Sequence, residues 1–352
     1  MPNQTKMPGE EFVTQMLNGE RDFAGIKLEE HFDMNQCDGY KPLLSYLIKS
    51  RIWENPIILD AADLKYLKAN RFYLPFIKAD YADFTGAKLP NVNFFKANLE
   101  KTTFWKAELY NANYRFANLK NVNFQKAVLE DANFQNAILD RANFKGANLM
   151  RAVLENVVAE RATFQRANLS QAIFCYTNLS DANMKAAKSQ DCNYWDAVLN
   201  STNFMNADLT GANFRSAHLE YANLKNAKLE RVNFQNAKLK QANLQNCDLS
   251  KAKLFNSNFE SANLQNANFQ NANLIGADFT DANVQNANLK GARMRNANFS
   301  HANLMYVENI EQALNLIDAN FNRTTVTPDA QKVIKKVLSQ RSMFVLKDGF
   351  ES

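Results

Sequence analysis

The chain has 352 residues, a formal net charge of +5 and 46% hydrophobic residues, so it contains enough apolar side chains to bury a large core. Its longest apolar runs are too short to cross a membrane, and its first residues lack an apolar signal segment behind a basic start. We therefore expect a cytoplasmic protein that makes no membrane contact. The four cysteines show no metal or redox spacing, which agrees with buried thiols in a reducing compartment.

Residues 1–83 are predicted to form a helical or irregular capping segment that includes an imperfect first coil. The stretch 21–28 reads as one isolated copy of the repeat described below, with Ile26 and Leu28 facing inward. The stretch 42–51 begins with a proline and has the apolar spacing of a helix. Such a segment would cover the open backbone groups at the end of a stacked structure.

Between Phe84 and Leu304 a small residue, a polar or variable residue and a large apolar residue recur every five positions, in 45 consecutive units. We call the large residue the centre; it is Leu, Phe, Tyr, Met or Val except at Ala159 and Ser189. On a helix, a step of five residues rotates the pattern by about 140°, so the centres would form no stripe. In extended backbone, residues two apart face the same way, so the small residue and the centre both point inward.

A chain with this pattern must bend every five residues. It has only 10 glycines, so the recurrent Asn before the centre is predicted to form the corners, because Asn tolerates turn conformations. Phe and Leu centres alternate with a period of ten over many units, which fits an even number of sides, and four is the smallest number that closes.

Units such as Ala132-Asn133-Phe134 and Ala262-Asn263-Leu264 follow the formula A-(N/D)-(L/F)-x-x. This tandem pattern resembles the pentapeptide-repeat family. The resemblance implies an all-β solenoid, a right-handed quadrilateral β-helix with 20 residues in each coil. Residues 84–304 would then form about 11 or more stacked coils, with small helical caps at the two ends.

Residues 305–352 are predicted to form a C-terminal capping segment with a helix. The stretch 308–317 is a short helix candidate, and residues 319–321 repeat the motif two positions out of frame. A further helix should begin at Thr327 and Pro328 and present one apolar face. The alternative is a detachable helix that binds a partner.

No catalytic constellation is apparent in the sequence. The three histidines are isolated from one another, and there is no Gly-rich phosphate loop or nucleophile motif. We therefore expect a protein that is not an enzyme, needs no cofactor or metal, and acts through its surface.

Charge separates two possible surface functions. Some members of the family protect DNA gyrase by presenting an acidic rod that resembles duplex DNA. Residues 84–304 contain 25 Lys and Arg against 17 Asp and Glu, a net charge of +8, which disfavours DNA mimicry.

A nucleic-acid-binding rod is the alternative function, because cations recur about every 20 residues in a basic stripe: Lys106, Lys126, Lys145, Arg166 and Lys185. The preceding corner carries Lys101, Arg141 and Arg161, and Glu100, Asp140 and Glu160 stand beside them. We therefore favour a solvated side whose charges keep rods apart, and expect nucleic acid to be an unlikely partner.

The favoured function is a scaffold that binds an unidentified protein partner. Outward positions are mostly Asn, Gln, Lys and Glu, but the third side carries apolar residues, and the interaction candidates are Phe95, Phe116, Val153, Ile173, Tyr176 and Trp195. A contiguous apolar patch with aromatic side chains on a rigid scaffold is typical of a binding site. The alternative is that the N-terminal segment covers this side, or that a second copy does so in a homo-oligomer.

Overall fold

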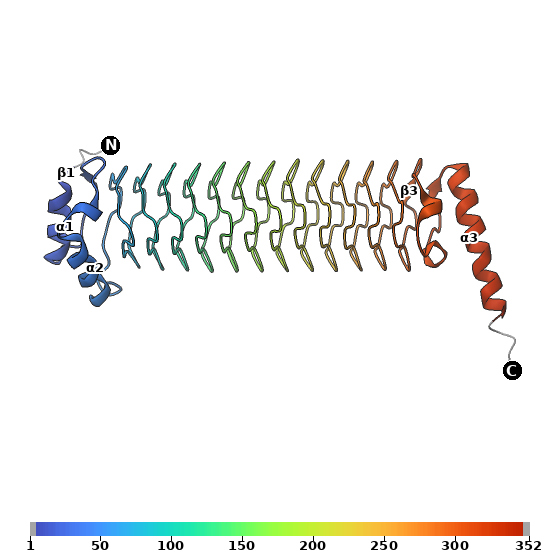
Figure 1. The fold of residues 1–352 in the computed structure, drawn as a ribbon, viewed down its shortest axis with the longest axis horizontal. Coiled ribbons are helices and arrows are strands. Elements are labelled where there is room, and N and C mark those ends of the chain that lie inside the picture. Colours follow the sequence, from blue (N-terminus) through green and yellow to red (C-terminus); the bar gives the residue numbers. More distant parts are fainter. Residues whose placement is uncertain (1–4, 348–352) are drawn as a thin grey trace. The chain divides into compact units, whose positions relative to one another are not determined.

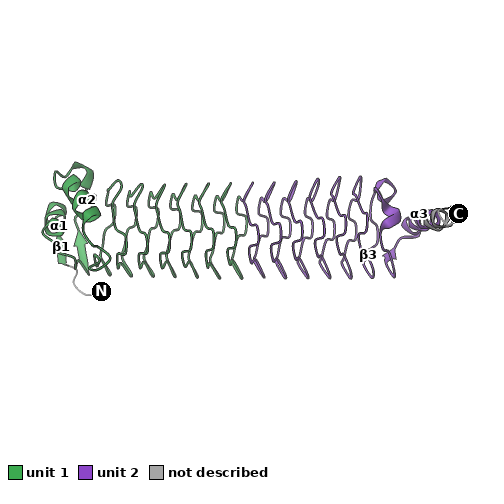
Figure 2. Cartoon of the chain, turned by 90° about the horizontal axis from the view of Figure 1, so that it is seen from below, with its two compact units in different colours: residues 1–188 green, residues 189–352 purple. Residues whose placement is uncertain are grey.

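The computed structural model describes residues 5–347, with side chains through residue 340. It contains two compact units, unit 1 (residues 1–188) and unit 2 (residues 189–352), which Figure 2 shows in different colours. Unit 1 has its helices before residue 57 and unit 2 has its helices after residue 309 (Figure 1). Apart from these ends, each unit consists of short turns joined by isolated parallel β-bridges.

Unit 1 opens with two short strands and three helices: β1 (Thr5–Met7), α1 (Gly9–Leu17), β2 (Ile26–Leu28), the 3-10 helix η1 (Met34–Gln36) and α2 (Tyr40–Lys49). Strand β2 pairs in parallel with β1, and Lys27 within it also bridges to Asp63. Ile26 and Leu28 are buried, as the isolated repeat predicted.

The two α-helices of unit 1 form because each buries one apolar face. In α1 the Phe12 ring meets Phe23 edge-on, with the ring centroids 4.9 Å apart. In α2, which starts two residues before the predicted helix, the Tyr40 hydroxyl donates a hydrogen bond of 2.8 Å to the carbonyl oxygen of Asn70. The Tyr40 ring also lies 6.2 Å from the ring of Phe72. These contacts join the helices to the neighbouring turns.

Each five-residue unit repeats one local geometry. Asn98 forms a parallel bridge with Asn118, 20 positions further on, and its neighbours Ala97 and Leu99 are buried. The Leu99 N–H donates to the Asn118 carbonyl at 2.8 Å, and the Asn118 N–H donates to the Ala97 carbonyl at 2.9 Å. Four such units make one coil of 20 residues. The pattern is present from Ile57 onward, before the predicted start at Phe84, and the predicted boundaries at 83 and 304 stay predictions.

The corners lie where the sequence did not predict them. The Leu99 carbonyl accepts a hydrogen bond from Thr102 N–H at 3.2 Å, and Lys101 between them has a φ of 58°. A positive φ at this point is the signature of a type II turn. The prediction of Asn corners is therefore wrong, because the Asn before each centre lies in a bridge on a flat side. Its side chain supports the turn instead: Asn123 Oδ1 accepts from Gln125 N–H at 3.1 Å.

Stacked aromatic rings fill much of the core of unit 1. Successive rings of one ladder lie 4.8–5.1 Å apart, in the order Phe84, Phe104, Phe124, Phe144 and Phe164. A second ladder, formed by Phe94, Tyr114 and Phe134, meets the first edge-on. Burying each such ring contributes about 1.5–3 kcal/mol of transfer free energy.

Unit 2 has the same construction. The rings of Tyr194, Phe214 and Phe234 stack at 4.7 and 5.1 Å. Further on, the stacked rings move to positions occupied earlier by Leu, and Phe259 and Phe279 stack at 5.0 Å. The sequence shows the same exchange, because Phe centres there take the positions in the 20-residue coil that Leu centres occupy earlier.

The end of unit 2 contains β3 (Asn303–Leu304), the 3-10 helices η2 (Ile310–Gln312) and η3 (Leu316–Asp318), β4 (Thr325–Val326) and α3 (Pro328–Lys347). The helix predicted over 308–317 is wrong, because Asn309 and Asn315 have left-handed backbone and limit it to two short 3-10 helices. The out-of-frame repeat is present: Asn298 bridges Asn320, and Phe321 stacks on Phe299 at 5.6 Å.

Helix α3 begins at the predicted position. The Thr327 side chain accepts a hydrogen bond from Ala330 N–H at 3.4 Å, which satisfies one N-terminal donor of the helix. Ile334 is buried on the apolar face, and α3 contacts η2 and η3.

Candidate interaction surface

Three phenylalanines and two cations form a cluster at one corner of unit 1. We call it the aromatic–cation cluster: Phe76, Phe95, Lys96, Arg115 and Phe116. All five occupy turn positions on three successive coils. The ring centroids of Phe76 and Phe95 are 5.7 Å apart at 85°, and those of Phe95 and Phe116 are 5.7 Å apart at 80°. Edge-to-face packing of this kind holds the rings in fixed relative positions.

The cations lie against the rings. Lys96 Nζ is 5.4 Å from the Phe95 centroid and 5.8 Å from that of Phe76, and Arg115 Cζ is 5.7 Å from that of Phe116. These distances are within the range of cation–π attraction. Among residues 5–340, no carboxylate lies within 4.0 Å of the charged atoms of Lys96 or Arg115. The cluster is therefore both apolar and positively charged.

The backbone conformation at this corner costs free energy for bulky residues such as phenylalanine. Phe76 and Phe116 both have a φ of 61°, in the left-handed region that bulky side chains rarely adopt. Phe116 is 45% exposed, so burial of its ring offsets only part of that cost. A positive φ recurs at corners throughout both units, so this cost belongs to the repeat geometry and is not specific to the cluster.

A second apolar group lies further along unit 1. Val153 and Ile173 are paired in a parallel bridge, and Tyr176 follows Ile173 at a corner with 42% of its surface exposed. Ile138 and Val158 form another bridge on the adjacent side, and both are exposed.

Polar turn residues separate the two groups. Gln135 Nε2 donates a hydrogen bond of 3.0 Å to Glu155 Oε2 on the coils between them. Of the six predicted residues, Phe95 and Phe116 therefore lie together, and so do Val153, Ile173 and Tyr176. Trp195 is 40% exposed and belongs to unit 2.

Sequence reasoning missed Phe76 and both cations of the cluster. Phe76 is 40 positions before Phe116 and therefore occupies the same corner frame, but it precedes the predicted start of the repeats at Phe84. Extending the five-residue frame upstream from Phe84 would have found it.

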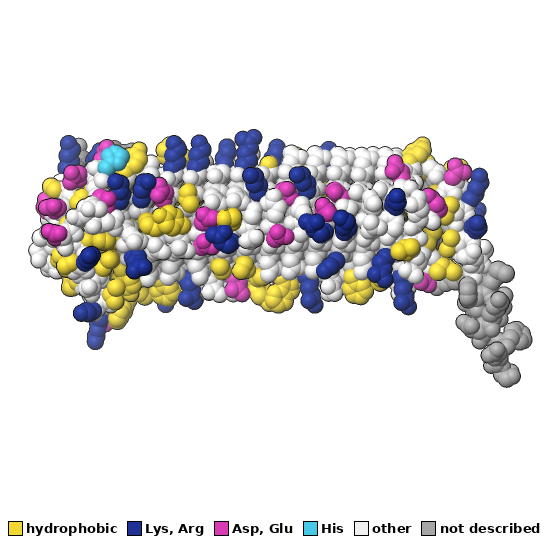
Figure 3. Space-filling view, viewed as in Figure 1, with side chains coloured by type: hydrophobic (Ala, Val, Ile, Leu, Met, Phe, Trp, Pro, Cys, Tyr) yellow, Lys and Arg dark blue, Asp and Glu magenta, His cyan; other side chains and the backbone are white. Residues whose placement is uncertain are grey.

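The predicted basic stripe occupies another corner of unit 1, and Figure 3 shows rows of Lys and Arg side chains projecting from this unit. Lys106 Nζ lies 4.1 Å from the Trp105 ring centroid. Within the part of the chain that has described side chains, no residue of the stripe forms an ion pair.

The corresponding corner frame of unit 2 carries amides instead of cations. Their Nδ2–Oδ1 hydrogen bonds measure 2.8–3.1 Å and join five left-handed residues in a ladder: Asn206, Asn226, Asn246, Asn266 and Asn286.

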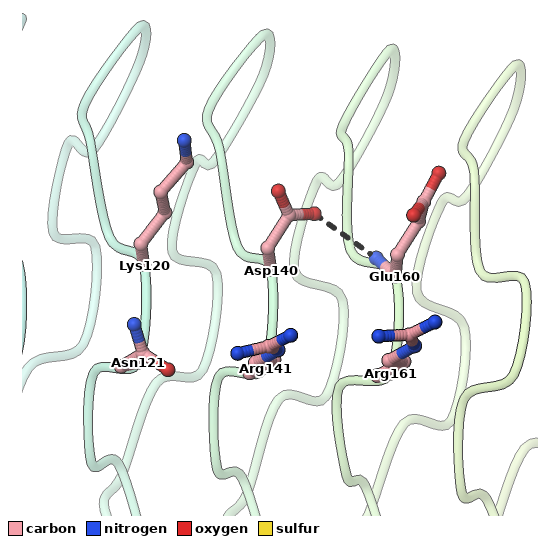
Figure 4. Close-up of a pocket in the computed structure, with 6 residues that line it drawn as sticks. All are labelled: Lys120, Asn121, Asp140, Arg141, Glu160 and Arg161. Atoms are coloured by element: carbon pink, nitrogen blue, oxygen red, sulfur yellow. Dashed lines mark hydrogen bonds between the residues drawn. The ribbon is translucent and has the colours of Figure 1, made fainter.

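A groove of about 240 Å³ lies at a further corner of unit 1 (Figure 4), lined by Lys120, Asn121, Asp140, Arg141, Glu160 and Arg161. Figure 4 shows the guanidinium groups of Arg141 and Arg161 side by side, with the two carboxylates at the adjacent positions. The Glu160 N–H donates to Asp140 Oδ1 at 3.3 Å, and Arg161 Nε lies 3.8 Å from Asp181 Oδ2. Charges of both signs offset one another, so the groove favours neither anions nor cations.

Among the described residues, no three or more His, Cys, Asp or Glu side chains form a group that could hold a metal ion. Burial raises the pKa of the Cys247 thiol to about 12, which keeps it protonated and a poor nucleophile. None of the helices over the described range is long and apolar enough to cross a membrane.

Comparisons with known proteins identify the repeat. The family profile "Pentapeptide repeats (8 copies)" matches residues 80–113, 117–156, 152–188, 190–220 and 217–254. The profile "Pentapeptide repeat region" matches residues 242–326. The comparison with curated proteins found no match.

Several solved structures are similar to this chain. HetL, a pentapeptide repeat protein involved in heterocyst differentiation regulation from the cyanobacterium Nostoc sp. strain PCC 7120, is 27% identical, with 81% of this chain and 96% of HetL covered and a TM-score of 0.30. QnrB1, a plasmid-mediated fluoroquinolone resistance protein, is 20% identical, with 57% of this chain and 97% of QnrB1 covered and a TM-score of 0.40. A pentapeptide repeat protein from the Arabidopsis thaliana thylakoid lumen is 27% identical, with 35% and 78% covered and a TM-score of 0.27.

Proposed function

Because the chain belongs to the pentapeptide repeat family, we propose that it is a non-enzymatic interaction scaffold that presents a rigid repeat surface to a protein partner. The proposal includes a right-handed quadrilateral β-helix of about 11 or more coils, helical caps at both ends and a cytoplasmic location. A stacked coil suits this function, since its outward side chains are held in fixed rows by the bridges beneath them.

The aromatic–cation cluster is the observation that carries the proposal. Aromatic and arginine side chains are enriched among the residues that dominate protein–protein affinity. Truncating a central residue of this kind typically costs about 2 kcal/mol or more of binding free energy. The side chains of Phe95 and Phe116 are only partly buried within unit 1, so a partner can bury the surface that remains exposed.

The test compares partner capture by the wild-type chain and by the double variant Phe95→Ser, Phe116→Ser. The control is Tyr221→Ser, because Tyr221 is 61% exposed at a left-handed corner of unit 2, outside the cluster. We expect the double variant to lose proteins that the wild-type and control chains both retain, with thermal unfolding unchanged within about 2 °C. Unfolding of the double variant, a change in its oligomeric state, or unchanged capture would refute this assignment.

Nucleic-acid binding is the second candidate, and the unpaired cations of the basic stripe favour it. Each phosphate contact by Lys or Arg releases counterions, so such binding should be weak at physiological salt and disappear as salt is raised. Fluorescence anisotropy with a labelled duplex measures this, with Lys106→Glu, Lys126→Glu as the test variant. Tight, salt-resistant binding that requires the stripe would make this the main function.

A further inference from the structure

We propose that the docking segment of the partner is an acidic peptide with aromatic side chains, and that it binds the aromatic–cation cluster of unit 1. This inference rests on the proposed scaffold function and specifies the chemistry of its partner. The partner must supply carboxylates for the cations and apolar surface for the ring edges.

The first argument is charge. Some surface cations of unit 1 have carboxylate partners, since Lys88 lies 2.7 Å from Glu108 and Arg151 lies 2.7 Å from Asp131, whereas the residues of the basic stripe have no such partner among the described residues. At the cluster, Lys96 and Arg115 have no carboxylate partner within the described residues, and neither does the exposed Lys78 on the adjacent side. Positive charge without an internal partner favours an anionic ligand.

The second argument is an unsatisfied donor. Arg115 Nε is buried and has no hydrogen-bond partner in the described part of the chain. A buried donor without an acceptor costs free energy in the unbound protein. A partner carboxylate can pair with the Nη groups of the same guanidinium through strong, charge-assisted hydrogen bonds, and the Arg115 side chain must shift for the carboxylate to reach Nε.

The arrangement of rings and cations selects a peptide over a nucleic acid. The left-handed corner position is occupied on three successive coils by Phe76, Lys96 and Phe116. The turn position just before it holds Phe95 on the coil of Lys96 and Arg115 on the coil of Phe116. The cations lie over the ring faces, at 5.4–5.8 Å from the centroids. Nucleic-acid bases bind aromatic side chains by stacking on ring faces, and here a cation lies against each of the three rings. Ring edges flanked by cationic donors instead suit aromatic and carboxylate side chains from one segment.

The experiment uses the full chain and labelled peptides of about twelve residues, followed by fluorescence anisotropy. The acidic aromatic probe repeats Glu-Phe-Asp-Gly; a basic probe repeats Lys-Phe-Lys-Gly, and a probe without aromatics repeats Glu-Ser-Asp-Gly. We expect the acidic aromatic probe to bind at least tenfold more tightly than the other two. Raising salt should weaken its binding.

Charge reversal provides the sharpest comparison. The variant Lys96→Glu, Arg115→Glu should lose affinity for the acidic aromatic probe about tenfold and gain affinity for the basic probe. The control Lys253→Glu, Lys290→Glu makes the same change in net charge at exposed positions of unit 2 and should behave as the wild type.

The outcomes separate this inference from the proposed function. Equal binding of acidic and basic aromatic probes at the cluster would overturn the charge inference and leave the scaffold function in place. Binding of a labelled oligothymidine, or self-association, that is lost on charge reversal would replace the peptide by another occupant. Absence of probe binding while Phe95→Ser, Phe116→Ser still abolishes partner capture would refute the acidic chemistry alone.

Discussion

Replacing Tyr114 by phenylalanine should stabilise unit 1. The Tyr114 ring is fully buried and stacks on Phe94 at 5.3 Å and on Phe134 at 4.9 Å, so a phenyl ring fits its place in the ladder. Its hydroxyl oxygen is buried and makes no hydrogen bond within the described residues. The substitution Tyr114→Phe removes this oxygen and leaves the ring contacts in place.

The magnitude follows from two opposing terms. An unsatisfied buried hydroxyl costs about 1–3 kcal/mol, and its removal recovers that free energy. The vacated space forfeits a few van der Waals contacts, worth about 0.1–0.2 kcal/mol each. We therefore expect a net gain of about 1 kcal/mol in the free energy of unfolding, which corresponds to a rise of about 2–4 °C in melting temperature for a unit of this size.

Tyr194 of unit 2 supplies the matched control. It is also fully buried in an aromatic ladder, but its hydroxyl lies 3.3 Å from Ser189 Oγ, with which it is hydrogen-bonded. Tyr194→Phe removes that hydrogen bond and should lower stability by about 1 kcal/mol. The same chemical change is thus expected to have opposite signs at the two sites.

Thermal unfolding followed by circular dichroism measures both variants, and hydrogen exchange locates the effect, because stability in stacked repeats is largely local. Slower exchange should be confined to the coils around Tyr114. A lower melting temperature for Tyr114→Phe, or equal shifts for the two variants, would refute the reasoning.

Two further predictions concern the amide ladder and pH. Asn266→Ala removes the hydrogen bonds to Asn246 (2.8 Å) and from Asn286 (3.0 Å) and places Ala in left-handed backbone. It should lower the free energy of unfolding in urea by about 1–2 kcal/mol, whereas Asn266→Gly should lower it less, because Gly adopts this backbone without strain. Equal losses for the two variants would rule out a contribution from backbone strain. Burial raises the pKa values of Tyr114 and Tyr194 well above the usual value for tyrosine. As pH rises, the unfolded chain therefore loses these two protons before the folded chain does. The free energy of unfolding should fall above about pH 10, by up to about 1.4 kcal/mol per group and pH unit. Melting temperatures between pH 8 and 11 test this, and an unchanged slope in Tyr114→Phe would contradict it.

The sequence determined the repeating local geometry. A small residue and a large apolar residue two positions apart must face the same way in extended backbone, so pairs such as Ala97 and Leu99 are buried together. The spacing of five also excluded a helix, and the tandem motif identified the family. These inferences needed only properties of neighbouring residues.

Only the tertiary structure decided where the chain turns. The positive φ falls two residues after each centre, at residues such as Lys101, because the turn must bring the centre carbonyl to the N–H three positions on. The turn preference of Asn predicted that the Asn before each centre forms the corner. In the structure, Asn123 and its equivalents form β-bridges with the coils above and below. Local propensity carries no information about those neighbours.

The candidate site was predictable in part. The apolar outward residues Phe95 and Phe116 stood out in the repeat frame, but Phe76 lay outside the predicted array. The pairing of rings with Lys96 and Arg115 depends on side-chain directions at successive corners, 20 residues apart in the sequence. Such contacts exist only once the coils are stacked, which is why the sequence supplied the residues of this surface and the tertiary structure supplied their arrangement.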